Sequence, residues 1–386
     1  MIEVTVRVDV APALLKWAVE RAGWDDETVD RRAPRLHEWV AGTVKPTLKQ
    51  LEKFAHDTHV PFGLLFLPEP PVEELPIADM RTFRNDPVRR TSADLLETIY
   101  SCQERQEWYR AHAEESGIDD LDFVGSAAIK DDPVAVADVI RTRLNLETNG
   151  AFRDWSTALR ELRNSIENTG VLVMISGIVG SNTHRVLDPQ EFRGFALADP
   201  IAPLIFVNGA DTKAAQIFTL VHELAHIFLG TSAVSDADVK LTVKAPEEQW
   251  CNRIAAEVLV PLEDLRIESF GQTDVVELDR LAAKFRVSTL VIVNRLLEAG
   301  TLSWDEYLRV FDAERVRVLS FLEDRQEGGS GGNYYYTQPV RLSRRFAQAV
   351  IGSTFEGTTT YREAYRLLGT RSHSTFQRMA EELGAA

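Results

Sequence analysis

Apolar residues in the middle of the chain follow two different periods, and each period predicts a different element. Three short runs, residues 171–175, 192–197 and 203–207, are continuously apolar or alternate with a period of two, as in buried or half-buried strands. They are followed by residues 214–229, which are largely apolar and helix-compatible and end at Gly230, a residue that commonly stops a helix. The pattern predicts a small sheet followed by a buried helix.

Helical spacing continues on both sides of this centre. Apolar residues recur from Trp250 to Leu259 and stop at Pro261, which predicts a second helix that begins near Glu247. Residues 278–300 indicate two helices joined by a short turn. Further helices are expected at residues 92–115, 133–146, 361–369 and 374–383. The chain is therefore expected to be α+β and mainly helical.

The predicted buried helix carries His222, Glu223 and His226 in the order H-E-L-A-H. Residues four apart lie on the same face of a helix, so the two imidazoles can bind one metal ion. The alternative is a buried helix whose histidines bind nothing, but their ring nitrogens would then need other partners. The pattern favours a zinc site in which Glu223 is the general base that activates water.

A catalytic zinc ion needs a third protein ligand. Glu248 opens the next predicted helix and is placed to be that ligand, while Asn252, one turn later, can hydrogen-bond a ligand side chain. Asp236 and Asp238 compete with Glu248, but they lie in a Ser- and Asp-rich stretch, residues 231–240, that is expected to be a loop with solvated carboxylates.

Three other residues near Glu248 stay open as ligands. Glu247 is its neighbour in the sequence. Glu257 lies nine residues further on and would face away from Glu248 by roughly 180°. Cys251 could bind as a thiolate, although a packed thiol is the simpler interpretation. Glu248 remains the favoured ligand.

These residues carry a resemblance to a known family. HELAH followed by E-x-x-C-N-x-x-A-A-E-x-L-x-P resembles the ImmA/IrrE metallopeptidases, a gluzincin-like group implicated in cleaving a partner repressor. The resemblance implies a zincin-like core whose small sheet holds an extended substrate along an edge strand. It also implies His222, His226 and Glu248 as zinc ligands and Glu223 as the base.

The residue that would stabilise the oxyanion of the transition state is not marked by any motif. His184, Arg185 and the tyrosines at 334–336 are candidates. Each is also explained as a loop or packing residue, so none is favoured for this role.

The N-terminal region resembles part of a Cro/repressor-type helix-turn-helix domain. Residues 39–51 match its second half, but the preceding stretch is about four residues too short, and Pro34 falls where the recognition helix would begin. Residues 1–75 contain nine Lys or Arg against thirteen Asp or Glu. This acidity favours a docking or remnant domain over one that reads DNA.

The net charge of −16 argues against a protein devoted to nucleic acid, although local basic patches can still bind phosphate. Residues 333–386 are such a patch, with seven Arg against four Glu, and DNA or partner contact is conceivable there. In the second helix of the pair at 278–300, only Asn294 and Arg295 offer polar side chains that could contact DNA bases. Packing or substrate docking is therefore at least as good an interpretation as base recognition.

Two connectors help to divide the chain. Residues 67–76 are proline-rich and stiff, and residues 328–332 form a flexible Gly-Gly-Ser-Gly-Gly link. The expected regions are a helix-turn-helix-like domain at 1–70, a helical bracing region at 77–150, a zinc metallopeptidase core at 151–270, a helix-turn-helix-like unit at 271–325 and a basic helical tail at 333–386.

Location follows from three features of the sequence. No apolar run approaches the ~20 residues that cross a bilayer, and the first ten residues include acidic ones and lack the apolar core of a signal peptide. The only cysteines, Cys102 and Cys251, lie far apart, which makes a disulfide framework improbable. We expect a cytoplasmic protein without a membrane partner.

The sequence thus predicts a zinc endopeptidase that makes a limited cut in a cytoplasmic regulatory partner such as a repressor or antitoxin. The alternative is a DNA-associated regulator or sensor in which the zinc is structural and no peptide is cut. A structural site closes its fourth position with protein, whereas a catalytic site leaves it open.

Overall fold

The computed structural model describes residues 6–80, 91–146, 154–235, 245–269, 271, 273–325 and 341–384, with the backbone alone for 319–325. The chain divides into two compact units. One contains Met1–Pro76 and Asp86–Ile99, and the other contains Ile77–Asn85 and Tyr100–Ala386. The five regions expected from the sequence remain a prediction, and the glycine-rich link at 328–332 lies outside the described residues.

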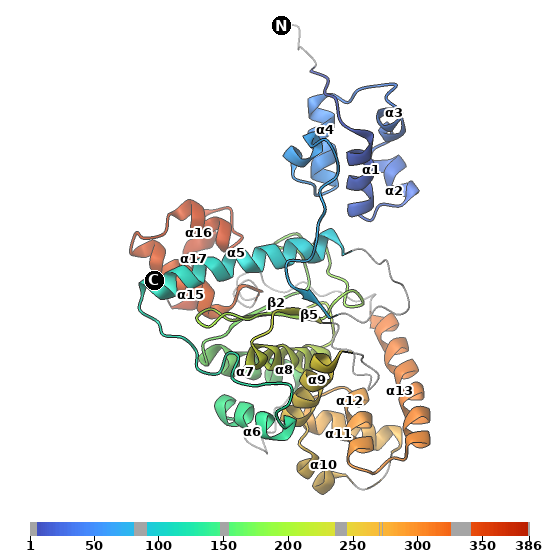
Figure 1. Cartoon of the computed structure of the whole chain (residues 1–386), viewed down its shortest axis with the longest axis vertical. Helices are drawn as coiled ribbons and strands as arrows, with labels where there is room; N and C mark the ends of the chain where they lie inside the picture. The colour runs from blue at the N-terminus through green and yellow to red at the C-terminus, as the bar shows by residue number, and fades with distance from the viewer. Residues whose placement is uncertain are drawn as a thin grey trace. The chain divides into compact units, whose positions relative to one another are not determined.

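The first unit is a small helical domain (Figure 1). Its elements are α1 (Pro12–Arg21), α2 (Asp26–Arg32), α3 (Leu36–Val40), α4 (Leu48–Asp57) and the 3₁₀ helix η1 (Phe62–Phe66). Trp39 and Phe54 meet edge to face in its core, with ring centroids 6.1 Å apart. Pro34 lies in the turn between α2 and α3, and α3 has only five residues. The helix-turn-helix assignment, with any DNA contact, stays a prediction.

The described residues of the second unit are built around a mixed five-stranded sheet. Its strands are β1 (Ala78–Asp79), β2 (Leu172–Ser176), β3 (Gly194–Leu197), β4 (Leu204–Asn208) and β5 (Ala233–Ser235). They lie in the order β1-β5-β3-β4-β2. The pairs β2 with β4 and β1 with β5 are parallel, and β3 is antiparallel to both β4 and β5. The three strands predicted from the sequence are confirmed as β2, β3 and β4.

β5 corrects one expectation, because residues 233–235 were assigned to a loop. Its three residues are too few and too mixed to show a strand pattern, yet all three are buried. Their backbone pairs with β3 on one side and β1 on the other. Tertiary pairing, which a local pattern does not reveal, therefore makes this segment a strand.

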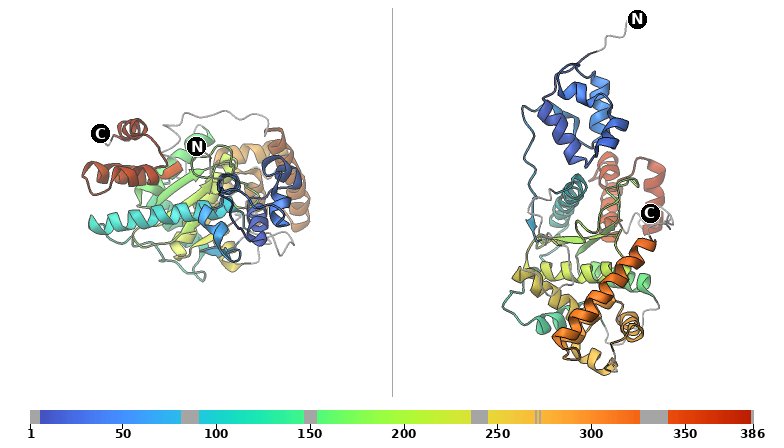
Figure 2. Two further views of the ribbon diagram at one scale, coloured as in Figure 1. Left: turned by 90° about the horizontal axis from the view of Figure 1, so that it is seen from above. Right: turned by 90° about the vertical axis from the view of Figure 1, so that its right-hand side faces the viewer.

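Helices cover both faces of the sheet (Figures 1 and 2). One face is covered by α7 (Trp155–Asn168) and α8 (Lys213–Leu229), with α6 (Pro133–Leu144) and α9 (Pro246–Leu259) packed beyond them. The second half of α5 (Ala93–Glu115) crosses the other face, where the Gln106 side chain donates to the carbonyls of Leu197 and Ala202.

Two further helical groups complete the second unit. The first comprises α10 (Leu262–Glu268), α11 (Val275–Phe285), α12 (Thr289–Glu298) and α13 (Trp304–Arg325), and the second comprises α15 (Arg344–Phe355), α16 (Tyr361–Leu367) and α17 (His373–Leu383). Glu167 of α7 anchors α15, since its Oε1 accepts bonds from the Ser343 hydroxyl and the Arg344 amide. The helices predicted around 92–115, 133–146, 278–300 and 361–383 are all present.

The architecture confirms the predicted α+β class with a zincin-like core. Among the described residues, no helix has both the length and the apolar character needed to cross a bilayer.

Candidate metal centre

The metal centre is built on α8, and the local sequence explains where this helix lies. The Thr212 hydroxyl caps its first turn by accepting a bond from the Ala215 amide, and Gly230 ends it in the left-handed conformation at φ +72°. Every residue from 216 to 228 is buried, because α8 is enclosed between the sheet and α9. Such a helix can be apolar on nearly all sides, as its sequence is.

Gly194 of β3 permits α8 to approach the sheet closely. A Cβ at this position would lie 2.6 Å from Thr219 Cγ2, 2.8 Å from the Phe206 carbonyl oxygen and 3.0 Å from Glu223 Oε1. Atoms in folded proteins do not pack that closely. Glycine therefore lets the Glu223 side chain lie directly against the β3 backbone.

His222, His226 and Glu248 converge on one point. The Nε2 atoms of the two histidines are 3.2 Å apart, and the Glu248 carboxylate lies 3.2 Å from His222 Nε2 and 3.1 Å from His226 Nε2. All three side chains are at most 1% exposed. Two imidazole nitrogens and one carboxylate, within reach of a single ion, are the donor set that zinc takes in hydrolytic sites.

Further residues orient this cluster. Thr231 Oγ1 lies 3.1 Å from His226 Nδ1, which leaves Nε2 directed at the cluster. Asn252 favours the charged form of the His222 imidazole and so contributes to its raised pKa. The hydrogen bond from Asn252 to a ligand side chain stays a prediction, and the sequence gave no sign of Thr231.

Glu223 lies beside the cluster and is fully buried. The hydroxyl of Ser235, on β5, donates a hydrogen bond to its Oε1. Its Oε2 is also buried and has no hydrogen-bond partner among the described residues. A buried carboxylate oxygen without a partner is costly, which is consistent with a group held ready for a ligand or water. Ser235 was missed from the sequence because its contact depends on β5.

Burial and the mutual contacts of these groups set their charge states. Burial alone would lower the pKa of His222, but the charge and hydrogen bond of Glu248 outweigh it and raise that pKa to about 9. Burial would raise the pKa of Glu248, yet the two imidazoles lower it to about 2. Burial raises the pKa of Glu223 to about 8 and lowers that of His226. Without a metal ion, Glu248 is thus strongly ionised, whereas Glu223 binds protons readily.

The other acidic candidates are not brought into the cluster. Glu257 faces away from it and pairs with Arg295 of α12, and its Oε1 accepts from the Leu262 amide at 3.3 Å. Glu247 precedes Glu248 but is not one of the converging residues. Asp236 and Asp238 lie outside the described residues.

The remaining candidates also lie elsewhere or have other roles. Cys251 is packed in the core, where burial raises the pKa of its thiol well above the usual range. His184 lines a separate cavity, and Arg185 belongs to the same loop. The tyrosines at 334–336 lie outside the described residues. No oxyanion donor is assigned from these candidates.

The fold and the cluster together define a metallopeptidase core of the zincin type. Residues 166–297 match the family model of Peptidase M78, the IrrE N-terminal-like domain, and this part of the chain belongs to the ImmA/IrrE family. Residues 342–382, which contain α15 to α17, match a domain of unknown function (DUF8813). No curated protein matches the chain.

Proposed function

We propose that the chain is a zinc-dependent endopeptidase that makes a limited, site-specific cut in a regulatory protein such as a repressor or antitoxin. The observation that carries the proposal is the convergence of His222, His226 and Glu248 beside a buried Glu223. These residues would hold the ion through two imidazole nitrogens and one carboxylate. Bound zinc would polarise the scissile carbonyl and lower the pKa of water.

Glu223 would transfer a proton from the attacking water to the leaving amine. Ser235 holds its Oε1, which leaves Oε2 as the atom that can take a proton from the attacking water. Once protonated, the carboxyl group can pass this proton to the leaving amine. Ser235 and the close packing against Gly194 would keep the carboxylate in place during this exchange.

The burial of the centre supports a limited cut over general digestion. All four residues are at most 1% exposed, whereas a digestive protease needs an open cleft for many chains. A substrate strand also cannot pair with the outer side of β5, because β1 already pairs with it in parallel over Ala78 and Asp79. A partner that rearranges these surfaces on binding would gain access, and other proteins would not.

The proposal is tested by new protein N-termini in cells that express the chain. Wild type, Glu223→Gln and the matched control Glu247→Gln are compared by mass spectrometry of N-terminal peptides. We expect a small set of new N-termini with wild type and Glu247→Gln and none with Glu223→Gln. The same new N-termini in all three samples would reject the proposed chemistry. Metal bound without any cut would favour a regulator with a structural ion.

A further inference from the structure

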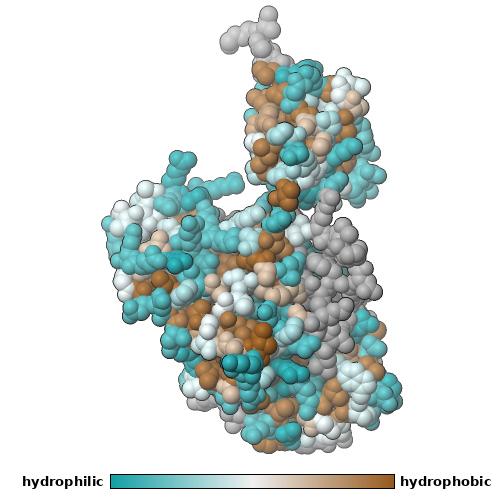
Figure 3. Space-filling view, in the orientation of Figure 1, coloured by the Kyte–Doolittle hydropathy of each residue, from teal (hydrophilic) through white to brown (hydrophobic). Residues whose placement is uncertain are grey.

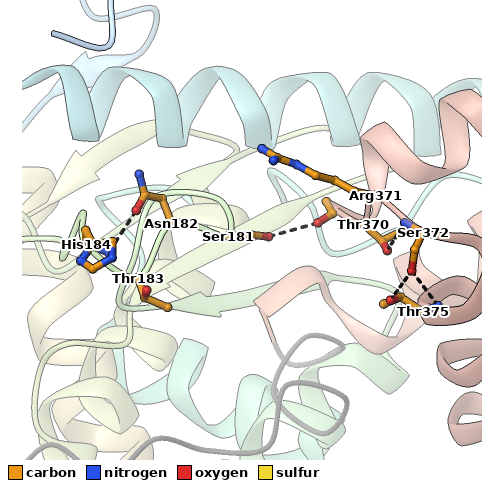
Figure 4. Close-up of a pocket in the computed structure, with 9 residues that line it drawn as sticks. Ser181, Asn182, Thr183, His184, Thr370, Arg371, Ser372 and Thr375 are labelled. Atoms are coloured by element: carbon orange, nitrogen blue, oxygen red, sulfur yellow. Dashed lines mark hydrogen bonds between the residues drawn. The ribbon is translucent and has the colours of Figure 1, made fainter. Parts of the chain in front are cut away.

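A second polar site lies between the peptidase core and the C-terminal helices. A cavity of about 590 Å³ separates the loop of residues 181–184, which follows β2, from residues 369–375 at the start of α17 (Figure 4). None of its lining residues belongs to the metal cluster. In the space-filling view, the surface over the C-terminal helices is mainly hydrophilic (Figure 3).

The lining of this cavity has the opposite charge to the chain as a whole. The protein carries 59 Asp or Glu against 43 Lys or Arg, yet none of the described residues that line the cavity is acidic. Arg371 and His184 line it, together with residues that carry mainly hydroxyl and amide groups. The guanidinium group of Arg371 extends toward the loop that carries His184 (Figure 4). The wall therefore offers hydrogen-bond donors and positive charge without competing carboxylates.

Arg371 differs from the arginines around it. Arg366 pairs with Glu104 at 2.6 Å, and Arg345 donates to the Tyr109 hydroxyl at 2.7 Å. Within the described part of the chain, Arg371 has neither an ion pair nor a side-chain hydrogen bond. An arginine without a carboxylate partner, beside a cavity, can bind an anion in a bidentate manner.

The walls of the cavity are fixed by hydrogen bonds. The Ser181 hydroxyl donates to the Gly369 carbonyl at 3.2 Å and joins the two sides. Asn182 Oδ1 accepts from the His184 amide at 3.0 Å and shapes the loop. Thr370, at the base of the second wall, is 7% exposed. The site is thus built from two segments held together.

The first turn of α17 adds a further attraction for anions. The Ser372 hydroxyl accepts from the Thr375 amide at 3.2 Å, as an N-cap does. The first amides of any helix lack partners inside it, and its N-terminus carries a partial positive charge. Guanidinium, imidazole, hydroxyl and helix-terminal N–H groups together suit the tetrahedral oxygens of a phosphate group.

We propose that this cavity binds a phosphate-bearing small molecule. Its volume lies within the range of small-molecule sites, about 300–1,000 Å³, and exceeds the needs of a phosphate ion alone. A nucleotide is therefore the expected source of the phosphate group, with free phosphate as the other. The proposal does not depend on the metal centre or on proteolysis.

The test is calorimetric titration of the full chain with AMP and with inorganic phosphate. Arg371→Gln and His184→Gln probe the cavity, and Arg362→Gln, an exposed residue of α16 outside the lining, is the matched control. Arg371→Gln should weaken binding about tenfold or more, because a hydrogen bond to a charged group contributes about 1.5–3 kcal/mol. Arg362→Gln should bind as wild type does, and so should Glu223→Gln.

The two probes, AMP and inorganic phosphate, distinguish a nucleotide from free phosphate as the ligand. AMP bound more tightly than phosphate identifies a nucleotide, and equal affinities identify free phosphate. The proposal is overturned if neither probe binds at about 1 mM, or if both cavity variants bind as wild type does. Arg371-dependent binding of duplex DNA, without binding of either small probe, would also overturn it and assign the surface to nucleic acid.

Discussion

Binding of zinc to the metal-free protein should release a proton. In the absence of metal, Glu248 raises the pKa of His222 to about 9, so this imidazole is charged at neutral pH. An imidazole that binds zinc must be neutral, and the proton of His222 therefore has to leave when the ion binds. Because the pKa is raised in the metal-free state, the apparent affinity should rise with pH and level off above about pH 9.

The size of the effect follows from that pKa. At pH 7, about one molecule in a hundred has a neutral His222, which lowers the apparent affinity about a hundredfold, or about 3 kcal/mol. Each pH unit below 9 should cost about a factor of ten. Calorimetry in two buffers of different protonation enthalpy would measure the protons released.

A variant of Glu248 tests whether its charge is the cause of the raised pKa of His222. In the metal-free protein, Glu248→Gln removes the charge that raises the pKa of His222, so an NMR titration should find this pKa below the ordinary range for histidine, where burial alone would place it. The reasoning is refuted if wild-type affinity is constant from about pH 6 to pH 8 and no proton is released.

Two further predictions concern packing, each with a control inside the chain. Gly194→Ala should lower the free energy of unfolding by about 1–3 kcal/mol, because the added Cβ overpacks the contact between β3 and α8. Gly352→Ala, in a helix with open space around it, should be neutral or stabilising. Equal effects of the two substitutions in denaturant unfolding would contradict the role given to Gly194. Arg295→Met leaves the carboxylate of Glu257 buried without its ion-pair partner and should lower the free energy of unfolding by about 3–5 kcal/mol. Arg110→Met, which breaks an exposed ion pair, should lower it by about 1 kcal/mol or less. Similar losses in the two arginine variants would show that the Glu257 pair does not stabilise the core.

The sequence predicted the parts of this fold that depend on local periodicity. The two histidines lie one turn apart on α8, and Glu248 opens α9, so both the helices and the facing residues could be read from spacing. The three long strands were predicted for the same reason, since each is a continuous or alternating apolar run.

Contacts between distant segments could not be predicted in this way. Ser235 reaches Glu223 only because β5 pairs with β3, and a three-residue strand has no recognisable period. Glu257 meets Arg295 across 38 positions, and Ser343 meets Glu167 across 176. These contacts depend on how helices and strands pack in space, which local propensity does not encode.

The central claim is that His222, His226 and Glu248 hold a catalytic metal ion beside Glu223. Its most direct test is the metal content of the purified chain, measured by mass spectrometry for wild type, His222→Ala, Glu248→Ala and Glu223→Gln. We expect about one zinc per chain in wild type and in Glu223→Gln, and strong loss in the two ligand variants. Zinc retained at the wild-type level in both His222→Ala and Glu248→Ala would contradict the assignment.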